Sequence, residues 1–147
     1  MNTRRIAVRG IIFRDGELLL AKFRQKDDSE SDYWGTFGGG LDIDETLEAG
    51  LTREMIEETG VQPKIGKLLF IQQFINKGQD NMEFFFEITN VEDYAQFDLE
   101  ATSHGILELN RSDFVDPKKE LVLPAFLSSI DIADYIKNDR PVYIWND

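Results

Sequence analysis

Apolar and polar residues alternate in short runs through much of the first 90 positions, the pattern of strands that bury at least one face. The runs that predict the longer strands are 5–13, 17–23, 67–75 and 82–89. Arg14-Asp15-Gly16-Glu17 separates the first two runs and predicts a hairpin turn. We expect 25–32, which is polar, to be a mobile loop. We expect 33–37 to be a short strand and the glycines 38–40 to form a loop before the next helix.

A helical period follows these strands. Leu47 and Leu51 are one turn apart in the segment 46–59, and Gly60 predicts its C-cap. Pro124 begins a second predicted helix, 124–137. Elsewhere we expect an irregular acidic segment at 92–103, a strand at 105–109, a helical turn at 112–115 and a strand or packed tail at 142–145. Strands mixed with two main helices predict an α/β fold with a mixed sheet covered on both faces.

The first helix carries acids where apolar residues belong. At about 100° per residue, Glu54 and Glu58 lie on the same stripe as the two leucines. Ile56 lies roughly opposite, so we expect the helix to be covered on two sides with its acids facing a cleft. The alternative is an ordinary acidic surface helix.

Three carboxylates, Glu54, Glu57 and Glu58, fall within little more than one helical turn. Like charges this close repel one another unless a cation lies among them. Hard oxygen ligands favour magnesium, manganese or calcium over zinc. The spacing therefore indicates a divalent metal site.

The segment Gly39–Val61 reads GGLDIDETLEAGLTREMIEETGV. Five residues separate Gly39 from Glu45, and seven more precede Arg53 and its Glu-rich run. The chain thereby resembles the Nudix hydrolases, because every fixed position of their 23-residue box is filled. This resemblance implies one α/β/α sandwich domain over residues 1–147 and cleavage of a nucleoside diphosphate linked to another group.

The resemblance also implies roles for the box residues. Glu54 and Glu58 are the expected main metal ligands, Glu57 assists, and the backbone carbonyl of Gly39 is the candidate fourth donor. The expected cofactor is Mg²⁺, for which Mn²⁺ can substitute.

Arg53 is expected to orient the acids through Glu45, because a guanidinium fork holds a carboxylate at two points. An ordinary ion pair of little energetic worth is the alternative. Phe37 and Asp44 depart from the commonest family pattern, which has proline and glycine there. Neither is a ligand position, but the conformation of this segment is left open.

Candidates outside the box come from weaker signals. The family often takes an extra acid from a later loop as general base, and Glu100 is the first candidate, before Glu83. His104 is the only histidine and has a pKa suited to proton transfer, although a lone histidine is more often structural.

Candidates for substrate binding lie near the predicted strand ends. Arg9, Arg24 and Lys22 are candidates for phosphate contacts, although most surface charges have no such role. Phe74 is a candidate for stacking on a base, as are Phe23, Tyr33 and Trp34. Each aromatic residue could equally belong to the core.

Charge limits the partners. The 147 residues carry a net charge of −12, which argues against non-specific nucleic-acid binding and against anionic membranes. A phosphorylated small molecule remains compatible, because bound divalent cations reverse the local field. With no cysteine, signal-peptide pattern or long apolar run, we expect a cytoplasmic protein. Dimers are common in the family, so a homodimer is an open expectation.

Two alternative functions each require a different sequence feature. A non-catalytic Nudix-fold domain for ligand sensing or protein binding would have lost box acids, and none is lost. A calcium-binding module would need an Asp-x-Asp-x-Asp-Gly loop, which the chain lacks. The substrate stays open among nucleoside triphosphates, ADP-ribose, sugar nucleotides and dinucleoside polyphosphates.

Overall fold

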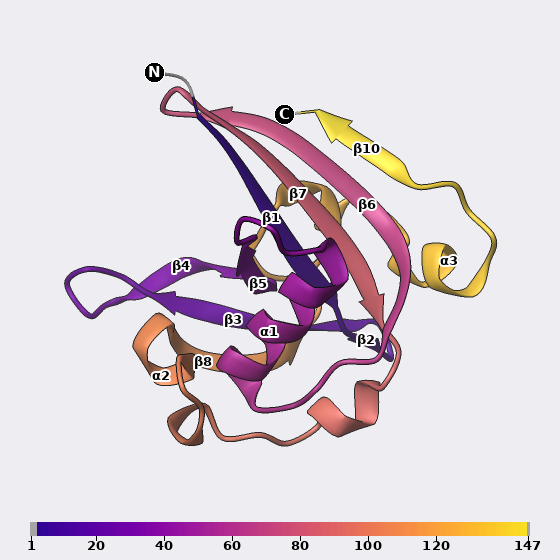
Figure 1. Cartoon of the computed structure of the whole chain (residues 1–147). Coiled ribbons are helices and arrows are strands. Elements are labelled where there is room, and N and C mark those ends of the chain that lie inside the picture. Colours follow the sequence, from indigo (N-terminus) through magenta and orange to yellow (C-terminus); the bar gives the residue numbers. More distant parts are fainter. Residues whose placement is uncertain (1–2, 147) are drawn as a thin grey trace.

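The computed structural model describes residues 3–146, and two β-sheets form its centre (Figure 1). The larger sheet is mixed and has the order β10-β6-β7-β1-β5, with β1 parallel to β7 and β10 parallel to β6. Its strands are β1 (Arg4–Ile11), β5 (Phe37–Gly40), β6 (Ile65–Asn76), β7 (Gln79–Ile88) and β10 (Tyr143–Asn146). The expected mixed sheet is confirmed.

A second, smaller sheet was not expected from the sequence. Its order is β2-β3-β4-β9, and β8 pairs with the other edge of β3. Its strands are β2 (Phe13–Arg14), β3 (Glu17–Arg24), β4 (Glu30–Gly35), β8 (Leu109–Val115) and β9 (Val122–Leu123). The polar loop expected at 25–32 is therefore shorter, because β4 begins at Glu30.

Two tight hairpins set the strand registers. Asp15 and Gly16 have φ of 52° and 83°, and Lys77 and Gly78 have φ of 50° and 79°. Positive φ at both central residues is the conformation that suits a two-residue hairpin. The turn at 14–17 is confirmed, and a second two-residue turn joins β6 to β7.

At two points a single residue carries the chain directly from one sheet to the other. Ile12 separates β1 from β2, and Thr36 separates β4 from β5. The strands expected at 5–13 and 33–37 are therefore each divided between the two sheets. The glycines 38–40 are consequently not a loop. They belong to β5 and pair antiparallel with 7–9 of β1. The expectation was wrong because glycine also serves close backbone approach, as the site shows below.

Helix α1 (Leu47–Thr59) packs against β1 and β5. Thr46 caps its start by accepting a hydrogen bond from the amide of Ala49, and Gly60, with φ of 76°, caps its end. The cap at Gly60 was predicted from the sequence, whereas the one at Thr46 was not. The expected cover on the opposite face is wrong, because Ile56 is 43% exposed there.

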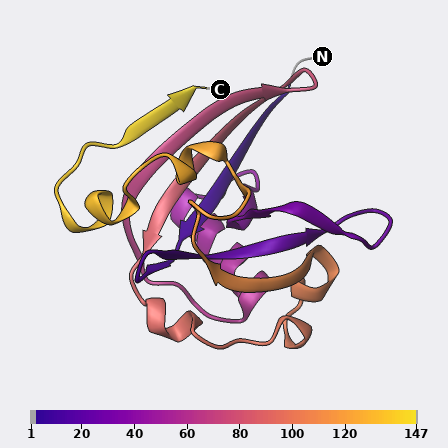
Figure 2. The same ribbon diagram turned by 180° about the vertical axis from the view of Figure 1, so that it is seen from behind.

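The far face of the larger sheet is covered by η3 (Ala125–Ser128) and α3 (Ile132–Lys137), best seen from behind (Figure 2). A single helix over 124–137 was expected, and this is wrong. Ser128 and Ser129 hydrogen-bond back to carbonyls of η3, while Asp131 starts a new helix as its N-cap. Such local hydrogen bonds compete with helix continuation.

The segment between β7 and β9 contains η1 (Val91–Tyr94), η2 (Leu99–Ala101) and α2 (Gly105–Glu108) before β8. The expected strand at 105–109 is a short helix, because the hydroxyl of Thr102 accepts the Gly105 amide and starts a helical turn. The expected helical turn at 112–115 is strand β8, which pairs with β3 and buries Val115.

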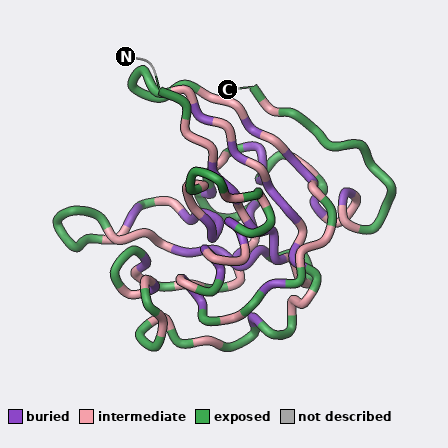
Figure 3. The backbone as a smooth tube through the Cα atoms, viewed as in Figure 1, coloured by how far each residue is buried: buried purple, intermediate pink, exposed green. Residues whose placement is uncertain are grey.

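Apolar residues of the strands alternate between two cores, one on each side of the strands. Buried positions accordingly recur along the central strands (Figure 3). In β3, Leu18 and Leu20 face the core under η3 and α3, whereas Leu19 faces the core under α1. Sheets buried on both faces and covered by helices on both sides confirm the expected α/β/α layering. No helix within residues 3–146 has the length and apolarity needed to cross a membrane.

Phe126 joins the helical cover to the sheet. Its ring centroid lies 5.4 Å from that of Phe70, 5.5 Å from that of Phe85 and 4.8 Å from that of Trp145. We predict that Phe126→Ala lowers the free energy of unfolding by roughly 3–5 kcal/mol, because a large cavity forms in the core. Urea denaturation measures the change. The exposed Ile144→Ala should cost less than about 0.5 kcal/mol, and equal losses would contradict this packing.

Candidate active site

Two box acids lie inside the protein, against strand β5. Glu58 is 1% exposed and Glu54 is 9% exposed. A side chain at Gly39 would place its Cβ 2.7–2.8 Å from the carboxylate of Glu54. Gly39 is therefore required for the backbone of β5 to lie against this acid.

Gly38 fixes the second acid. Its backbone N–H donates to Oε1 of Glu58 at 2.8 Å. Its φ of 129° is a conformation that other residues rarely adopt, and a Cβ there would clash with the carbonyl oxygen of Val8. The glycines before the box helix thus hold both buried carboxylates in place.

Arg53 connects the acids to the segment that precedes the helix. Its Nε and Nη2 donate to the two oxygens of Glu45 at 2.8 and 2.9 Å, and Nη2 also donates to the carbonyl of Gly40 at 3.2 Å. Its Nη1 donates to Glu54 at 3.1 Å and to Glu57 at 3.3 Å. The Arg53 guanidinium and the Asp42 amide lower the pKa of Glu45 to about 2. The guanidinium thus forms hydrogen bonds with three carboxylates, and Oδ2 of Asp42 lies 3.4 Å from its Nε.

A cavity of about 320 Å³ opens over these acids. Its lining combines four carboxylates with glycine backbone and a few other side chains: Glu54, Glu57, Glu58, Glu108, Gly38, Gly39, Gly40, Arg5, Arg9, Phe23 and His104. We call it the acidic cavity.

Helix α2 brings residues to the acidic cavity that sequence reasoning missed or left open. Glu108 lines the cavity and was not a candidate, because the segment 105–109 was expected to be a strand. His104 also lines it, and its Nδ1 lies 3.7 Å from Oε2 of Glu57. Glu100, the expected general base, is exposed in η2 and does not line this cavity. Only the acidity of the whole 92–108 region could have pointed to Glu108.

Burial disfavours the ionised form of the buried acids. Desolvation raises the pKa of Glu58 to about 8, and the negative charges of Glu54 and Glu108 add to this effect. The Gly38 amide and the Arg9 guanidinium act in the opposite direction. Burial also raises the pKa of Glu54. The positive charges of the chain itself therefore do not fully neutralise these buried carboxylates.

Carboxylate and backbone carbonyl oxygens are the donors that magnesium and calcium prefer, so the chemistry of the lining fits a hard divalent cation. As the side chains of residues 3–146 stand, no three of the acidic and histidine groups converge closely enough to enclose a metal ion. The lining therefore matches such an ion in donor type and charge. Coordination would require the carboxylates to turn toward it.

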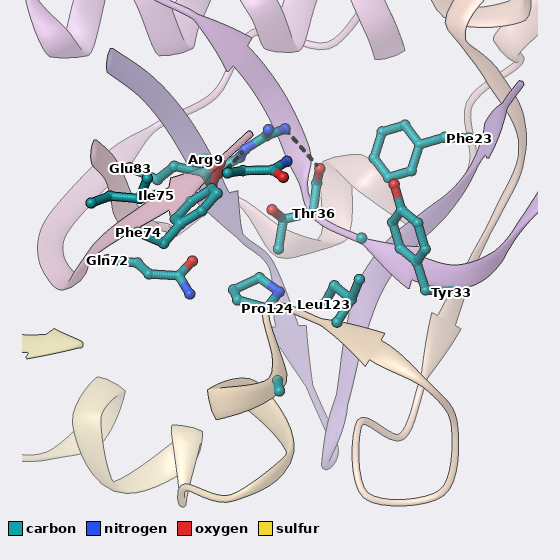
Figure 4. Close-up of a pocket in the computed structure, with 13 residues that line it drawn as sticks. Arg9, Phe23, Tyr33, Thr36, Gln72, Phe74, Ile75, Glu83, Leu123 and Pro124 are labelled. Atoms are coloured by element: carbon teal, nitrogen blue, oxygen red, sulfur yellow. Dashed lines mark hydrogen bonds and ion pairs between the residues drawn. The ribbon is translucent and has the colours of Figure 1, made fainter. Parts of the chain in front are cut away.

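A larger cavity of about 730 Å³ adjoins the first between the two sheets (Figure 4). We call it the inter-sheet cavity. Arg9 and Phe23 line both cavities. Arg9 donates to Glu83 at 3.3 Å and to the carbonyl of Gly38 at 3.0 Å. Phe74 and Glu83, both candidates from the sequence, also line the inter-sheet cavity.

Arg24 and Lys22, the other basic candidates, line neither cavity. Arg24 donates to the carbonyl of Ile106 at 3.0 Å and so holds α2 against β3. Lys22 lies with its amine 5.3 Å from the ring centre of Trp34. Arg24 thus contacts α2 and Lys22 lies beside Trp34, and alternation along the strand could not show this.

The model of the NUDIX domain family matches residues 3–128, so the chain belongs to this family. The ADP-ribose pyrophosphatase of Methanocaldococcus jannaschii is 39% identical over 64 residues, 44% of this chain and 37% of that protein. The CTP pyrophosphohydrolase of Escherichia coli K12 is 35% identical over 66 residues, 45% of this chain and 48% of that protein. The matches thus span less than half the length of these two relatives.

Solved structures agree with the fold. The MutT protein of Methanosarcina mazei Go1 superposes with a TM-score of 0.71 and 23% identity, over 92% of this chain and 95% of that one. At this level of identity the agreement concerns the fold alone. It extends beyond the box to nearly the whole chain.

The raised pKa of Glu58 predicts how stability depends on pH. The native state keeps a proton that the unfolded chain has released, so the free energy of unfolding should fall as pH rises from about 5 to 8 in chelating buffer. Glu58→Gln removes this proton, so its decline over the same range should be clearly smaller. Urea denaturation at several pH values measures both. The exposed Glu48→Gln should decline as the parent does, and a Glu58→Gln decline equal to the parent's would disprove the assignment.

Proposed function

We propose that the protein is a divalent-metal-dependent pyrophosphohydrolase that cleaves a phosphoanhydride of a nucleoside diphosphate linked to another group. The observation that carries this proposal is the set of four carboxylates lining one small cavity beside a larger one. Membership in the NUDIX domain family and the names of the two relatives, which act on ADP-ribose and CTP, support the same class of substrate.

Mg²⁺ is the proposed cofactor, and Mn²⁺ can substitute for it. Glu54 and Glu58 would hold it, with Glu57 and the carbonyl of Gly39 as further ligands. When bound, the cation neutralises the oxygens of the diphosphate and polarises the bond to be cleaved. A cation here would also relieve the cost of ionising Glu58, which burial makes high.

Arg53 has a positioning role in this proposal. Its two hydrogen bonds to Glu45 fix the guanidinium plane, which leaves Nη1 directed at Glu54 and Glu57. Preorganised charges cost no rearrangement when the substrate arrives. Replacing Arg53 would therefore disturb the positions of the Glu54 and Glu57 carboxylates rather than remove a direct contact with the substrate.

A general base must reach the attacking water within about 3 Å or through one further water. Glu108 is the candidate that the geometry favours over Glu100, because it lines the acidic cavity while Glu100 is exposed in η2. Glu108 also comes from outside the box, so its oxygens are not needed for the proposed metal ligands. His104, 3.7 Å from Glu57, is a second group able to take up a proton.

Turnover of a nucleotide panel tests the proposed function. Nucleoside triphosphates, ADP-ribose, sugar nucleotides and dinucleoside polyphosphates are incubated with Mg²⁺, and the products are identified. We expect nucleoside monophosphate from at least one substrate, no turnover in EDTA, and recovery with Mg²⁺ or Mn²⁺. Full turnover in EDTA would exclude the metal role. Nucleotide binding without turnover would instead support a non-catalytic domain.

Glu58→Gln should lower turnover by at least about 100-fold, because it removes one preorganised charged group without changing side-chain size. Glu48→Gln, on the exposed side of the same helix, is the matched control and should retain parental turnover. Steady-state kinetics at saturating Mg²⁺ compares them. A fully active Glu58→Gln beside an inactive Glu48→Gln would mean that the wrong helix face has been assigned.

Glu108→Gln should lower turnover more than tenfold while manganese affinity stays nearly unchanged, because a base removes a proton without holding the metal. Glu100→Gln and His104→Ala are measured beside it. A loss confined to Glu100→Gln would restore the base expected from the sequence. Parental turnover in all three variants would place the base within the box, at Glu54 or Glu57.

A further inference from the structure

We propose that the outer edge of strand β10 pairs antiparallel with β10 of a second copy of this chain, which joins the larger sheets of two protomers. The inference is independent of the proposed function, because no residue of β10 is among those lining the acidic cavity or the inter-sheet cavity. It assigns an interaction surface to the chain and identifies its partner.

Strand β10 forms one end of the larger sheet, with β6 on one side of it (Figure 1). Within residues 3–146 no strand lies on its other side, so the backbone groups along that side have no partner in the sheet. Proteins usually block such an edge with charged residues, proline or a bulge. Strand β10 reads Tyr-Ile-Trp-Asn and pairs with β6 without a shift in register, so it has none of these. The edge therefore suits another extended strand.

Apolar side chains lie along this edge. Tyr143 is 47% exposed, Ile144 is 56% exposed, and Val142, just before the strand, is 42% exposed. Ile144 also ends a row of paired apolar residues that crosses the sheet from Phe84 through Ile71. Adjoining exposed apolar side chains are typical of interaction sites. A partner strand with apolar side chains would continue the row beyond β10.

The sequence of β10 is complementary to itself in an antiparallel pair. Residues directly opposite each other in such a pair project from the same face of the sheet. A pair centred on Ile144 places this residue opposite the partner's Ile144, and Tyr143 opposite the partner's Trp145. Tyr143 and Trp145 already share one face of β10, where their ring centroids are 4.4 Å apart. Both pairs are of the apolar or aromatic kinds that stabilise antiparallel strands.

The opposite edge of the larger sheet, β5, is not open to the same pairing. The amide of Gly38 donates to Glu58, and its carbonyl accepts from Arg9. The carbonyl of Gly40 accepts from Arg53. A head-to-tail contact between β10 and β5 would also build an open chain of copies, whereas a two-fold pairing of β10 with itself closes. The occupied edge of β5 thus favours a closed dimer.

Charge sets how this dimer responds to salt. Each copy carries a net charge of −12, so two copies repel each other at long range. Strand β10 has no charged side chain, so no ion pair within the strand pairing offsets this repulsion. Salt screens the repulsion and should therefore strengthen the association. Four paired residues from each copy bury less area than the roughly 1,200–2,000 Å² of stable interfaces, so we expect a weak dimer.

Sedimentation velocity over a range of protein and salt concentrations tests the proposal. The parent should form a dimer whose fraction rises with both. Ile144→Lys puts two like charges opposite each other and should raise the dissociation constant at least about tenfold. Ile43→Lys, at a position 91% exposed before α1, is the matched control and should dimerise as the parent does. A parent that stays monomeric, a dimer that salt weakens, or a dimer unchanged by Ile144→Lys would overturn the proposal.

Mixing two variants tests the register of the pair. Ile144→Lys and Ile144→Glu should each be monomeric alone, with circular dichroism showing that both are folded. Their equimolar mixture should dimerise at least about tenfold more tightly than either alone, because opposite charges then face each other. A mixture as monomeric as its components would overturn pairing centred on residue 144, and open-ended larger species would overturn the two-fold closure. Sedimentation needs no substrate, so failure of the proposed function would leave this result unchanged.

Discussion

The close approach of β5 to α1 is the constraint on which the candidate active site depends. A strand and a helix normally keep their backbones apart by the width of their side chains. Here Gly38 and Gly39 remove those side chains, so a backbone amide reaches Glu58 and the chain lies directly against Glu54. Two carboxylates can therefore be buried at the edge of a core and still face a cavity.

This arrangement concentrates negative charge where the protein supplies little positive charge. Arg53 is shared among Glu45, Glu54 and Glu57, and Arg9 is paired with Glu83. A buried acid without a full counter-charge raises its pKa, as Glu58 does. Ionisable groups with a shifted pKa are frequent at functional sites, because the missing counter-charge is often supplied by the ligand. A cation bound at this cavity would also make the net charge of −12 compatible with a phosphorylated substrate, because it reverses the local field.

Sequence reasoning succeeded where local chemistry decides the structure. The cap at Gly60 and the hairpin at Asp15-Gly16 follow from the preferences of single residues, and both were predicted. The pairing of Arg53 with Glu45 came from the family resemblance, and the structure brings the two together. The candidate ligands Glu54, Glu57 and Glu58 could be located from the sequence because all three lie in one helix.

Prediction failed where tertiary pairing overrides local preference. The switch between sheets at Thr36 leaves no mark on the alternation of apolar residues, and it moves the glycines from a loop into β5. The reversed assignments of α2 and β8 hid Glu108, because an acid can be placed near a site only when its element is placed. The inter-sheet cavity was missed for another reason. Its lining comes from both sheets, and no single segment of the sequence indicates the second sheet.

Arg9 shows how the two cavities can act as one site. Its guanidinium spans from Glu83 on β7 to the carbonyls of Thr36 and Gly38, so it ties the larger sheet to the point where the chain crosses between sheets. The same crossing carries Gly38, whose amide holds Glu58. A shift of β7 would therefore reach the buried acid through three hydrogen bonds, which join Glu83 to Arg9, Arg9 to Gly38 and Gly38 to Glu58. The residues that line the inter-sheet cavity and the residues that hold the acids thus share the hydrogen bonds of Arg9, and the geometry of one cavity constrains that of the other.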